Sequence, residues 1–397
     1  MKHIGGPLLK VTMIIPNNLK GGGGNEKSLL YLARHRPDWV DLTIIQTDDR
    51  LREVISQEFV LTMLNGGSLA TIPSPNHRLL FMRRKLPLLL LENFLISPLV
   101  LFWSRSSREK VAGILNGTEV VYTFNNNYSW LVPRGVAIVG VTDTVFVWGV
   151  MGTVFSKLAS LGLVYPRILG FHLLRPLTGW KNRHSDFLLP NGVDTNAFLT
   201  SVYTRSRIRM LFVSRMERKK GILDLLQAWD LVNKMRGDVE LHIVGRGSLE
   251  QEVSAIADRY TSVIYHGGCS EQDLIRIYRD SDVFILPSRG ETFGNVIVEA
   301  LSCGLYIIAG ENLRGNFDDL EGHGFLEYCQ YDSVNLSNAI VRSINNIEKI
   351  RLNRSSCHQY AVEYFDWGGI AKKFYENLRS IAGQSQGNEI QHVDPTF

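Results

Sequence analysis

RMLFVS at residues 209–214 is the first of several apolar runs that alternate with helix-like segments through the second half of the sequence. The later runs are VELHIVG at 239–245, SVIYHG at 262–267, DVFILPS at 282–288 and LYIIAG at 305–310. The segments between them have helical character, at 221–235, 250–260, 272–279 and 296–303. Continuous Val, Ile and Leu strands that alternate with helices indicate a parallel sheet covered by helices on both faces.

The first half of the sequence holds a second series of the same kind. VTMIIP at 11–16 leads into the glycines of 21–24, and residues 26–34 are predicted to form a helix. Further apolar runs of strand length lie at 42–46, 120–123 and 136–141. Two series indicate two doubly wound, Rossmann-like α/β domains, with the polar stretch 196–207 as their boundary. We expect domains over 1–198 and 206–365, a last helix over 366–382 that crosses back to the N-terminal domain, and a disordered tail over 383–397.

The composition is that of a folded, enzyme-like chain. At 397 residues the sequence is too long for one ordinary core, and its 45% hydrophobic and 21% charged residues are close to globular averages. A net charge of +4 is too small for a nucleic-acid footprint, so no nucleic-acid partner is expected. None of the four cysteines forms a C-x-x-C pair and no histidines have ligand spacing, so neither a metal site nor a disulfide framework is predicted. This cysteine usage and the lack of an apolar leader in residues 1–9 predict a reducing, cytoplasmic location.

One N-terminal segment bears on membrane attachment. Residues 86–103 (LPLLLLENFLISPLVLFW) are largely apolar, but they contain Glu92 and two prolines, which disfavour a spanning helix. The basic residues 83–85 precede the segment and further basic residues follow it between 105 and 110. Basic flanks favour peripheral docking on an anionic membrane surface, here the inner face of the cell membrane, over a core helix or a true span.

The strongest functional pattern is SRGETFGNVIVEALSCG at residues 288–304, which holds the carboxylates Glu291 and Glu299. Gly294 and Asn295 are predicted to form a loop-to-helix junction, with Glu291 in the loop and Glu299 about one turn inside the helix. The open N–H groups and the positive dipole end of such a helix start bind anions. Carboxylates on either side of that start suit the hydroxyls of a nucleotide sugar, although a surface helix with two solvated glutamates has the same spacing.

A second pattern, SRMERKKG at residues 214–221, directly follows the apolar run of 210–213. Arg215 offers a bidentate fork to phosphate oxygens and Lys220 a mobile point charge, and together they suit a diphosphate leaving group. A solvated basic loop is the plain alternative. The position at the end of a predicted parallel strand, where ligands bind in such sheets, favours the functional interpretation.

These patterns resemble the E-x₇-E and R-x₄-K-G signatures of retaining glycosyltransferases of family four (glycosyl transferases group 1), which have the GT-B fold. Further matching segments are NGVD at 191–194 with Phe198, Gly245-Arg246-Gly247, Gly267-Gly268 and FDW at 365–367. The resemblance covers the C-terminal domain well, and the N-terminal half only at 16–26 and 191–194. It implies two Rossmann-like domains that face each other across a cleft holding the active site.

The resemblance also implies roles for the matching residues. Arg215 and Lys220 would bind the donor diphosphate and stabilise it as leaving group, and Glu291 would contact hydroxyls of the transferred sugar. Glu299 would hold the ribose hydroxyls. Donor contacts are further implied for Phe293, Gly294 and Asn295 and, from the opposite domain, for Gly22, Gly23 and Gly24.

The implied reaction retains the anomeric configuration and needs no metal ion or other cofactor. The implied partners are a UDP-, GDP- or ADP-linked sugar and a glycan or lipid-linked acceptor, in glycolipid, lipid-linked glycan or polysaccharide synthesis. Two positions depart from the family pattern. Ser214 stands where the family usually has Gly, and residues 142–144 lack the His that commonly follows a mid-domain strand, which leaves Asp143 as the candidate for that place.

Four alternatives are weighed against this interpretation. GGGGNEKS at 21–28 nearly matches the phosphate-binding P-loop of an NTPase, but Glu26 stands where that motif requires glycine. GRGSLE at 245–250 lacks the last glycine of a dinucleotide-binding turn, which disfavours a dehydrogenase. A non-hydrolysing sugar-nucleotide epimerase shares the GT-B fold and needs no second substrate. An inactive, membrane-docked partner of another transferase is favoured only by the missing His.

Overall fold

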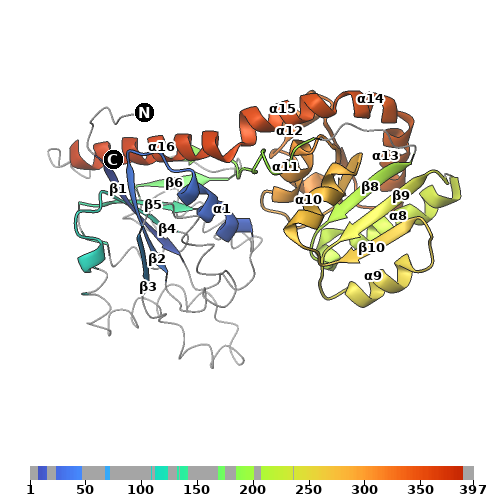
Figure 1. Ribbon diagram of the computed structural model, residues 1–397, viewed down its shortest axis with the longest axis horizontal. Coiled ribbons are helices and arrows are strands. Elements are labelled where there is room, and N and C mark those ends of the chain that lie inside the picture. Colours follow the sequence, from blue (N-terminus) through green and yellow to red (C-terminus); the bar gives the residue numbers. More distant parts are fainter. Residues whose placement is uncertain are drawn as a thin grey trace, which may run out of the picture. The chain divides into compact units, whose positions relative to one another are not determined.

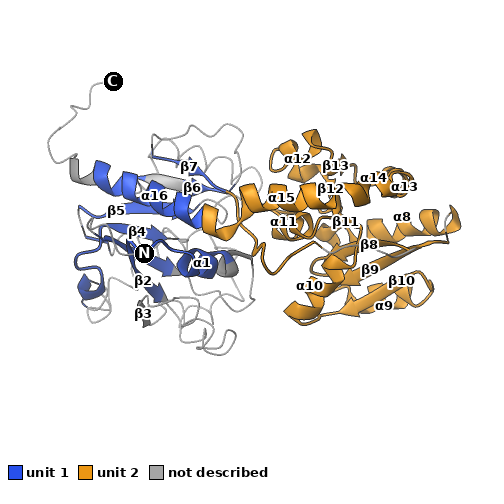
Figure 2. Ribbon diagram, turned by 45° about the horizontal axis from the view of Figure 1, so that its top comes forward, with its two compact units in different colours: residues 1–189, 370–397 blue, residues 190–369 orange. Residues whose placement is uncertain are grey.

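The computed structural model describes residues 8–15, 24–46, 68–71, 109, 112–123, 132–133, 135–141, 169–174, 185–200, 207–235 and 237–387. The chain forms two compact units, coloured separately in Figure 2. Unit 1 comprises residues 1–189 and 370–397, and unit 2 comprises residues 190–369. Each unit is built on one parallel sheet, which confirms the predicted α/β class with two Rossmann-like units.

Unit 2 has a six-stranded sheet in the order β10-β9-β8-β11-β12-β13. Its strands are β8 (Ile208–Val213), β9 (Val239–Val244), β10 (Val263–Gly267), β11 (Val283–Leu286), β12 (Tyr306–Gly310) and β13 (Leu326–Cys329). Its helices are α8 (Ile222–Met235), α9 (Glu250–Ala257), α10 (Glu271–Arg279), α11 (Asn295–Ser302), α12 (Asp318–Gly322), α13 (Ser333–Asn345), α14 (Ile347–Leu352) and α15 (Arg354–Phe365), with the short 3₁₀ turns η5 (Arg218–Lys220) and η6 (Glu311–Leu313).

The strand order of unit 2 reverses between β8 and β11. From β8 the chain proceeds to β9 and β10 on one side, and after β11 it proceeds to β12 and β13 on the other. Because parallel crossovers are right-handed, the helices of the two halves cover opposite faces of the sheet. The strands between them are therefore apolar on both sides, and every residue of β11 is buried. A point of reversed strand order is where open α/β sheets bind ligands, beyond the carboxyl ends of the strands.

Unit 1 has a seven-stranded parallel sheet in the order β3-β2-β1-β4-β5-β6-β7. Its strands are β1 (Leu9–Ile15), β2 (Val40–Gln46), β3 (Ser68–Thr71), β4 (Val120–Thr123), β5 (Ala137–Val141), β6 (Gly170–Leu173) and β7 (Phe187–Leu188). The described helices include α1 (Gly24–Arg34), which follows β1, and α16 (Trp367–Gly387), which ends the described chain. Figure 1 shows α16 running along the sheet of unit 1.

Apolar burial attaches α16 to unit 1 from residue 370 onward. Phe374 is fully buried, and its ring lies 4.9 Å from Tyr122 of β4 in an edge-on contact and 5.5 Å from His172 of β6. The adjacent Tyr375 donates a hydrogen bond of 3.2 Å to the carbonyl of Leu32 in α1. The C-terminal helix is therefore part of the core of a unit whose sheet is formed by the first half of the sequence.

His172 completes this core as a neutral imidazole. Burial lowers its pKa to about 4, so the ring is uncharged at neutral pH. Its Nε2 lies 3.1 Å from the carbonyl of Leu189, which can only accept, and this fixes the proton on Nε2. Nδ1 is then the acceptor for the hydroxyl of Tyr122 at 2.9 Å. A polar side chain is thus accommodated in an apolar core because both ring nitrogens are hydrogen-bonded.

The borders of the units differ in detail from those expected. Residues 190–198 pack with unit 2, because Val193 forms a bridge with Asp366 and the hydroxyl of Ser302 donates to the carbonyl of Phe198 at 2.7 Å. Helix α16 extends to Gly387, past the position 383 where the sequence suggests a tail. Residues 388–397 lie outside the described part of the chain.

Replacing Phe374 with Ala should destabilise unit 1 selectively. Removing a fully buried phenylalanine typically costs about 3–5 kcal/mol, because transfer energy is lost and a cavity remains. Hydrogen exchange should therefore show reduced protection in β4 and β6, with β8 and β11 of unit 2 unchanged. The control is Leu352→Ala in α14, where the side chain is 82% exposed. It should leave the hydrogen-exchange protection of both units unchanged. Loss of protection in unit 2 alone would contradict this assignment of α16.

Candidate active site

The two charged sequence patterns lie together at the reversal of strand order in unit 2. SRMERKKG follows the carboxyl end of β8, and SRGETFG follows the carboxyl end of β11. These two strands are hydrogen-bonded neighbours, so their carboxyl ends are adjacent. The third neighbour, β12, ends at Gly310 and leads into η6, which brings Asn312 to the same edge. The sheet therefore collects residues from three loops at one place.

Lys220 and Glu291 form an ion pair between the first two of these loops. The Nζ atom of Lys220 contacts Oε1 of Glu291 and lies 3.4 Å from the carbonyl of Gly290. The two side chains are only 8% and 17% exposed. A pair with so little solvent around it interacts strongly, and either charge alone would be costly to bury. The contact couples the basic pattern directly to the first carboxylate of the acidic pattern.

Backbone contacts hold the same two loops together. The N–H of Arg289 donates to the carbonyl of Lys219 at 2.7 Å, and the hydroxyl of Ser288 donates to that carbonyl at 3.2 Å. Gly221 follows η5 with φ +76°, and a Cβ there would lie 2.1 Å from the carbonyl oxygen of Pro287. The glycine is needed both for its backbone conformation and for the close approach of the two loops.

Gly245 plays a similar part on the other side of the basic loop. It has φ +135°, and a Cβ there would lie 1.9 Å from the carbonyl oxygen of Ser214. The N–H of Met216 donates to the carbonyl of Arg246 at 3.0 Å. The segment Gly245-Arg246-Gly247, singled out in the sequence, therefore supports the loop that contains Arg215.

Helix α11 begins at Asn295, which confirms the predicted loop-to-helix junction. Gly294 precedes it in the left-handed conformation with φ +89°, Glu291 lies in the loop, and Glu299 lies in the second turn of the helix. The ring of Phe293 is buried, so its side chain serves the core while its backbone remains part of the junction. The side-chain oxygen of Asn295 accepts a hydrogen bond of 2.9 Å from Asn191. In the first turn of α11 the N–H of Ile297 donates to the carbonyl of Gly294 at 2.8 Å. The N–H groups of Asn295 and Val296 precede the first helical hydrogen bond, and such groups at a helix start suit an anion.

Arg215 lies at the same loop but has a different partner. Its side chain is 64% exposed and forms a salt bridge of 2.8 Å with Glu217, which also contacts Lys219 at 3.2 Å. Exposed pairs of this kind contribute little to stability and exchange partners easily. Arg215 is therefore an accessible cation, whereas Lys220 is already held in place by Glu291.

Several polar residues that the sequence patterns do not reveal support the site. The Asn312 amide spans the acidic loop. In the orientation that satisfies both of its atoms, the oxygen accepts from the N–H of Glu291 at 3.1 Å and the nitrogen donates to the carbonyl of Ser288. Asn316 donates to the carbonyl of Thr292 at 3.0 Å. The hydroxyl of Tyr278 in α10 donates to Oε2 of Glu299 at 2.9 Å. The only sequence clue to the two asparagines is that they follow β12, and Tyr278 lies in an ordinary amphipathic helix.

Some of the predicted residues are not placed. Gly22, Gly23 and Asp143 lie outside the described residues, as do the basic residues 83–85 and the apolar segment 86–103. Gly24 is described and is the first residue of α1 instead of a loop residue. Within the described ranges, no helix has the length and apolar character needed to cross a membrane. The same ranges contain no group of three or more His, Cys, Asp or Glu side chains suited to a metal ion.

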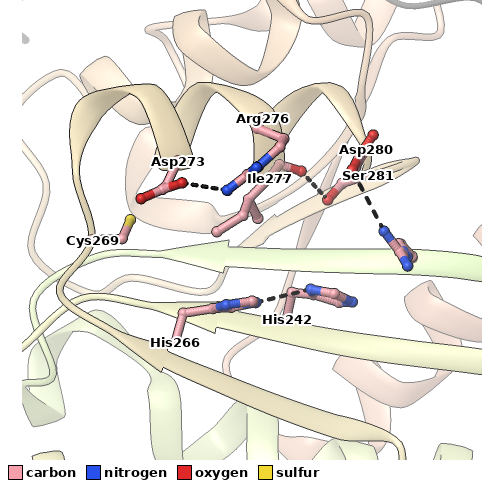
Figure 3. A pocket seen from close by; sticks show the side chains of 9 residues that line it. His242, His266, Cys269, Asp273, Arg276, Ile277, Asp280 and Ser281 are labelled. Atoms are coloured by element: carbon pink, nitrogen blue, oxygen red, sulfur yellow. Dashed lines mark hydrogen bonds and ion pairs between the residues drawn. The ribbon is translucent and has the colours of Figure 1, made fainter.

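A groove of about 390 Å³ lies elsewhere on unit 2, between α10 and the sheet. Figure 3 shows His242 and His266 on the strands below α10, and their Nδ1 and Nε2 atoms are 3.0 Å apart. Burial lowers the pKa of His242 to about 4 and also lowers the pKa of His266, so both rings are neutral. The charged lining residues pair with one another or with Glu240: Arg276 with Asp273, and Arg209 with Asp280 and Glu240. None of the predicted site residues lines this groove.

Comparison with known proteins assigns a class to this geometry. Residues 207–346 match the family described as glycosyl transferases group 1. Sucrose-phosphate synthase from Thermosynechococcus elongatus has a similar structure, with a TM-score of 0.69 at 16% identity over 95% of this chain and 100% of that one. Anabaena HepE in complex with UDP and glucose gives a TM-score of 0.66 at 17% identity over 94% of this chain and 100% of that one. At these identities the likeness establishes the fold alone.

Residues 207–346 of unit 2 thus match a group 1 glycosyltransferase domain, and the predicted resemblance to GT-B glycosyltransferases is confirmed. Among curated relatives, phosphatidyl-myo-inositol mannosyltransferase of Mycobacterium leprae is 29% identical over 212 residues, which is 51% of this chain and 55% of that protein. Mannosylfructose-phosphate synthase of Agrobacterium fabrum is 25% identical over 240 residues, 54% of this chain and 51% of that protein. The chain thus spans about half the length of the curated relatives it matches.

Replacing Gly221 with Ala should disrupt the junction of the two charged loops. The new Cβ would clash with the Pro287 carbonyl. The alanine would also have to adopt the left-handed backbone conformation of Gly221, which by itself costs about 1–3 kcal/mol for a residue other than glycine. We expect the free energy of unfolding of unit 2 to fall by at least about 2 kcal/mol in denaturant titrations. The matched control is Gly237→Ala, where a Cβ meets nothing within 4 Å. Equal stability of the two variants would show that the close approach is not a constraint.

Proposed function

We propose that this chain is a retaining glycosyltransferase that moves a sugar from a nucleoside-diphosphate sugar to an acceptor hydroxyl. The observation that carries the proposal is the contact of Lys220 with Glu291 at the carboxyl ends of β8 and β11. It joins a cation suited to a phosphate group to a carboxylate suited to sugar hydroxyls, within the region that matches the group 1 glycosyltransferase family. A cation can stabilise the charge that grows on a departing diphosphate, and a carboxylate beside it can accept hydrogen bonds from sugar hydroxyls.

The cations would act on the leaving group. As the bond between the sugar C1 and the diphosphate breaks, negative charge grows on the phosphate oxygens, and Lys220 and Arg215 would stabilise it. The N–H groups at the start of α11, around Phe293, Gly294 and Asn295, would add fixed partial positive charge at the same place. Because Lys220 is held in position before the donor binds, little reorganisation is needed during the reaction.

The carboxylates would orient the rest of the donor. Glu291 would accept hydrogen bonds from hydroxyls of the transferred sugar, and Glu299 from the ribose hydroxyls of the nucleotide. The acceptor hydroxyl would attack C1 from the face that the diphosphate leaves, and its proton would pass to the departing phosphate oxygen. The new bond then forms on the same face as the broken one, which retains the anomeric configuration. In this scheme neither a metal ion nor another cofactor takes part.

The donor would carry UDP, GDP or ADP. UDP is the first to test, because HepE, which shares the fold, was crystallised with UDP and with UDP-glucose. Gly22, Gly23, Gly24 and Asp143 of unit 1 are proposed to complete the donor site.

The acceptor is proposed to be a lipid-linked glycan or glycolipid at the cytoplasmic face of the cell membrane. The apolar segment 86–103 with its basic flanks supports this choice, because such segments dock on anionic lipid. The name of the mycobacterial relative, phosphatidyl-myo-inositol mannosyltransferase, likewise refers to a lipid acceptor. A glycan acceptor in polysaccharide synthesis is tested in the same assay.

Replacing Lys220 or Glu291 should abolish most of the sugar transfer. Each single change leaves one charge without its partner and with little solvent around it, which could destabilise the fold. The variants Lys220→Ala and Glu291→Ala are therefore compared with the double variant Lys220→Met/Glu291→Gln, which removes both charges and keeps a similar side-chain volume. All should lose at least about 100-fold in kcat in the presence of EDTA, as expected when electrostatic stabilisation of the leaving group is removed. Product anomers are identified by NMR.

The control for this series is Lys234→Ala, which removes an exposed cation paired with Asp230 in α8. It should transfer sugar at the wild-type rate. Near-normal turnover of the folded double variant would sink the site assignment, and an inverted product would refute retention. Interconversion of the donor without an acceptor would favour the epimerase.

Removing the basic residues before the apolar segment should weaken membrane binding. The variant Arg83→Ser/Arg84→Ser/Lys85→Ser is expected to bind at least about tenfold less to vesicles of phosphatidylcholine and phosphatidylglycerol, because each basic residue near an anionic surface contributes about 1 kcal/mol. Co-sedimentation measures the binding. The control is a variant in unit 2 that removes the same amount of charge, Lys234→Ser/Arg342→Ser/Lys349→Ser. If both variants lose vesicle binding equally, the protein is attracted to the anionic surface by its overall charge and does not dock through residues 83–103.

A further inference from the structure

The carboxylate of Glu299 is held from a neighbouring helix. The hydroxyl of Tyr278 donates a hydrogen bond of 2.9 Å to Oε2 of Glu299 and lies 3.4 Å from the carbonyl of Val296. Tyr278 is in the last turns of α10, whereas Glu299 is in α11. The partner is therefore supplied by an element that belongs to neither charged sequence pattern.

Tyr278 is itself fixed in place. Its side chain is fully buried, and its ring lies 5.7 Å from Phe198 in an edge-on contact and 5.9 Å from Phe284 of β11. Phe198 is in turn bound to α11, because the hydroxyl of Ser302 donates to its carbonyl at 2.7 Å. The hydroxyl thus points at Glu299 from a rigid position, whereas Glu299 itself is only partly buried and remains within reach of solvent.

The direction of this hydrogen bond is settled by charge. Burial and the neighbouring Glu299 raise the pKa of the Tyr278 phenol well above its usual range, so the phenol keeps its proton. A phenol that cannot ionise is a permanent donor, and a carboxylate is its natural acceptor. A hydrogen bond to a charged acceptor restricts the rotation of the carboxylate more firmly than a bond between neutral groups would.

We infer that Tyr278 is a positioning residue that orients Glu299. It thereby makes the site bind a nucleotide with ribose hydroxyls more tightly than one whose ribose lacks the 2′- and 3′-hydroxyls. The inference rests on the proposed function, in which Glu299 receives the ribose hydroxyls of the donor. A glutamate in a helix has several rotamers, and fixing one before binding lowers the entropic cost of the hydrogen bonds it then forms. Tyr278 does not touch the substrate, so its effect is confined to ligands that have hydroxyls for Glu299 to bind.

The test compares nucleotides that differ only in those hydroxyls. Calorimetry gives the Kd of UDP, GDP and ADP for the full chain, and then the Kd of the 2′,3′-dideoxy form of the diphosphate that binds best. Tyr278→Phe removes a single oxygen atom and conserves the ring. It should raise the Kd of the ribonucleotide about tenfold, the size expected for a weakened hydrogen bond to a charged group, and leave the Kd of the dideoxynucleotide within about twofold.

A second variant separates positioning from folding. Glu299→Gln removes the charge, and in the double variant Tyr278→Phe/Glu299→Gln no carboxylate faces the place that the phenol hydroxyl has left. The double variant is therefore expected to fold even where Tyr278→Phe alone does not. In that background Tyr278→Phe should change neither Kd by more than about twofold, because there is no carboxylate left to orient.

Tyr306→Phe is the matched control. Its hydroxyl also donates to a glutamate, Glu327 Oε2 at 3.3 Å, but it lies at the amino end of β12, the opposite edge of the sheet from the charged loops. It should leave both nucleotide affinities unchanged.

The outcomes separate the inference from the proposal beneath it. If no diphosphate binds the wild-type chain, the proposed function fails and the inference falls with it. If a ribonucleotide binds and Glu299→Gln weakens it, but Tyr278→Phe changes nothing, the function stands and the inference is overturned. The inference would also be overturned if Tyr278→Phe lowered the affinity for the ribonucleotide and the dideoxynucleotide equally, in the wild-type or the Glu299→Gln background. Tyr278 would then be a packing residue only.

Discussion

The largely buried ion pair of Lys220 and Glu291 is the contact on which the candidate site depends. It connects the loop after β8 with the loop after β11, at the point where the strand order of unit 2 reverses. A buried ion pair gives little net stability, since the cost of removing both charges from water offsets most of their attraction. Its geometry must therefore be maintained by other interactions.

Those interactions are mainly backbone contacts that tolerate no side chain. Gly221 lies against the Pro287 carbonyl and Gly245 against the Ser214 carbonyl, so both approaches require the absence of a Cβ. The hydrogen bond from Arg289 to Lys219 fixes the spacing between the loops. With the main chain held in this way, Lys220 is fixed against Glu291, as its proposed contact with a donor phosphate requires, whereas the exposed Arg215 is paired with Glu217 at the surface.

A second layer of polar residues completes this arrangement. Asn312 and Asn316 bind the main chain of the acidic loop, and Tyr278 binds the carboxylate of Glu299. All three come from elements that carry no charged motif. Their hydrogen bonds restrain the main chain around Glu291 and the carboxylate of Glu299, on which the proposed donor contacts depend.

The sequence by itself determined the class of the fold and the loops of the candidate site. Buried parallel strands must be apolar on both faces, so their continuous Val, Ile and Leu runs are visible without a structure, and the glycine at 294 marks the start of α11. Only the tertiary structure decided that Lys220 pairs with Glu291, because the two residues are 71 positions apart and no local pattern encodes such a contact. Arg215, by contrast, pairs with Glu217 of its own loop. The tertiary structure also decided the borders of the units. Phe374 and Tyr375 belong to the core of unit 1 because that sheet leaves an apolar surface around Tyr122 and His172, and a helix at the far end of the chain buries it.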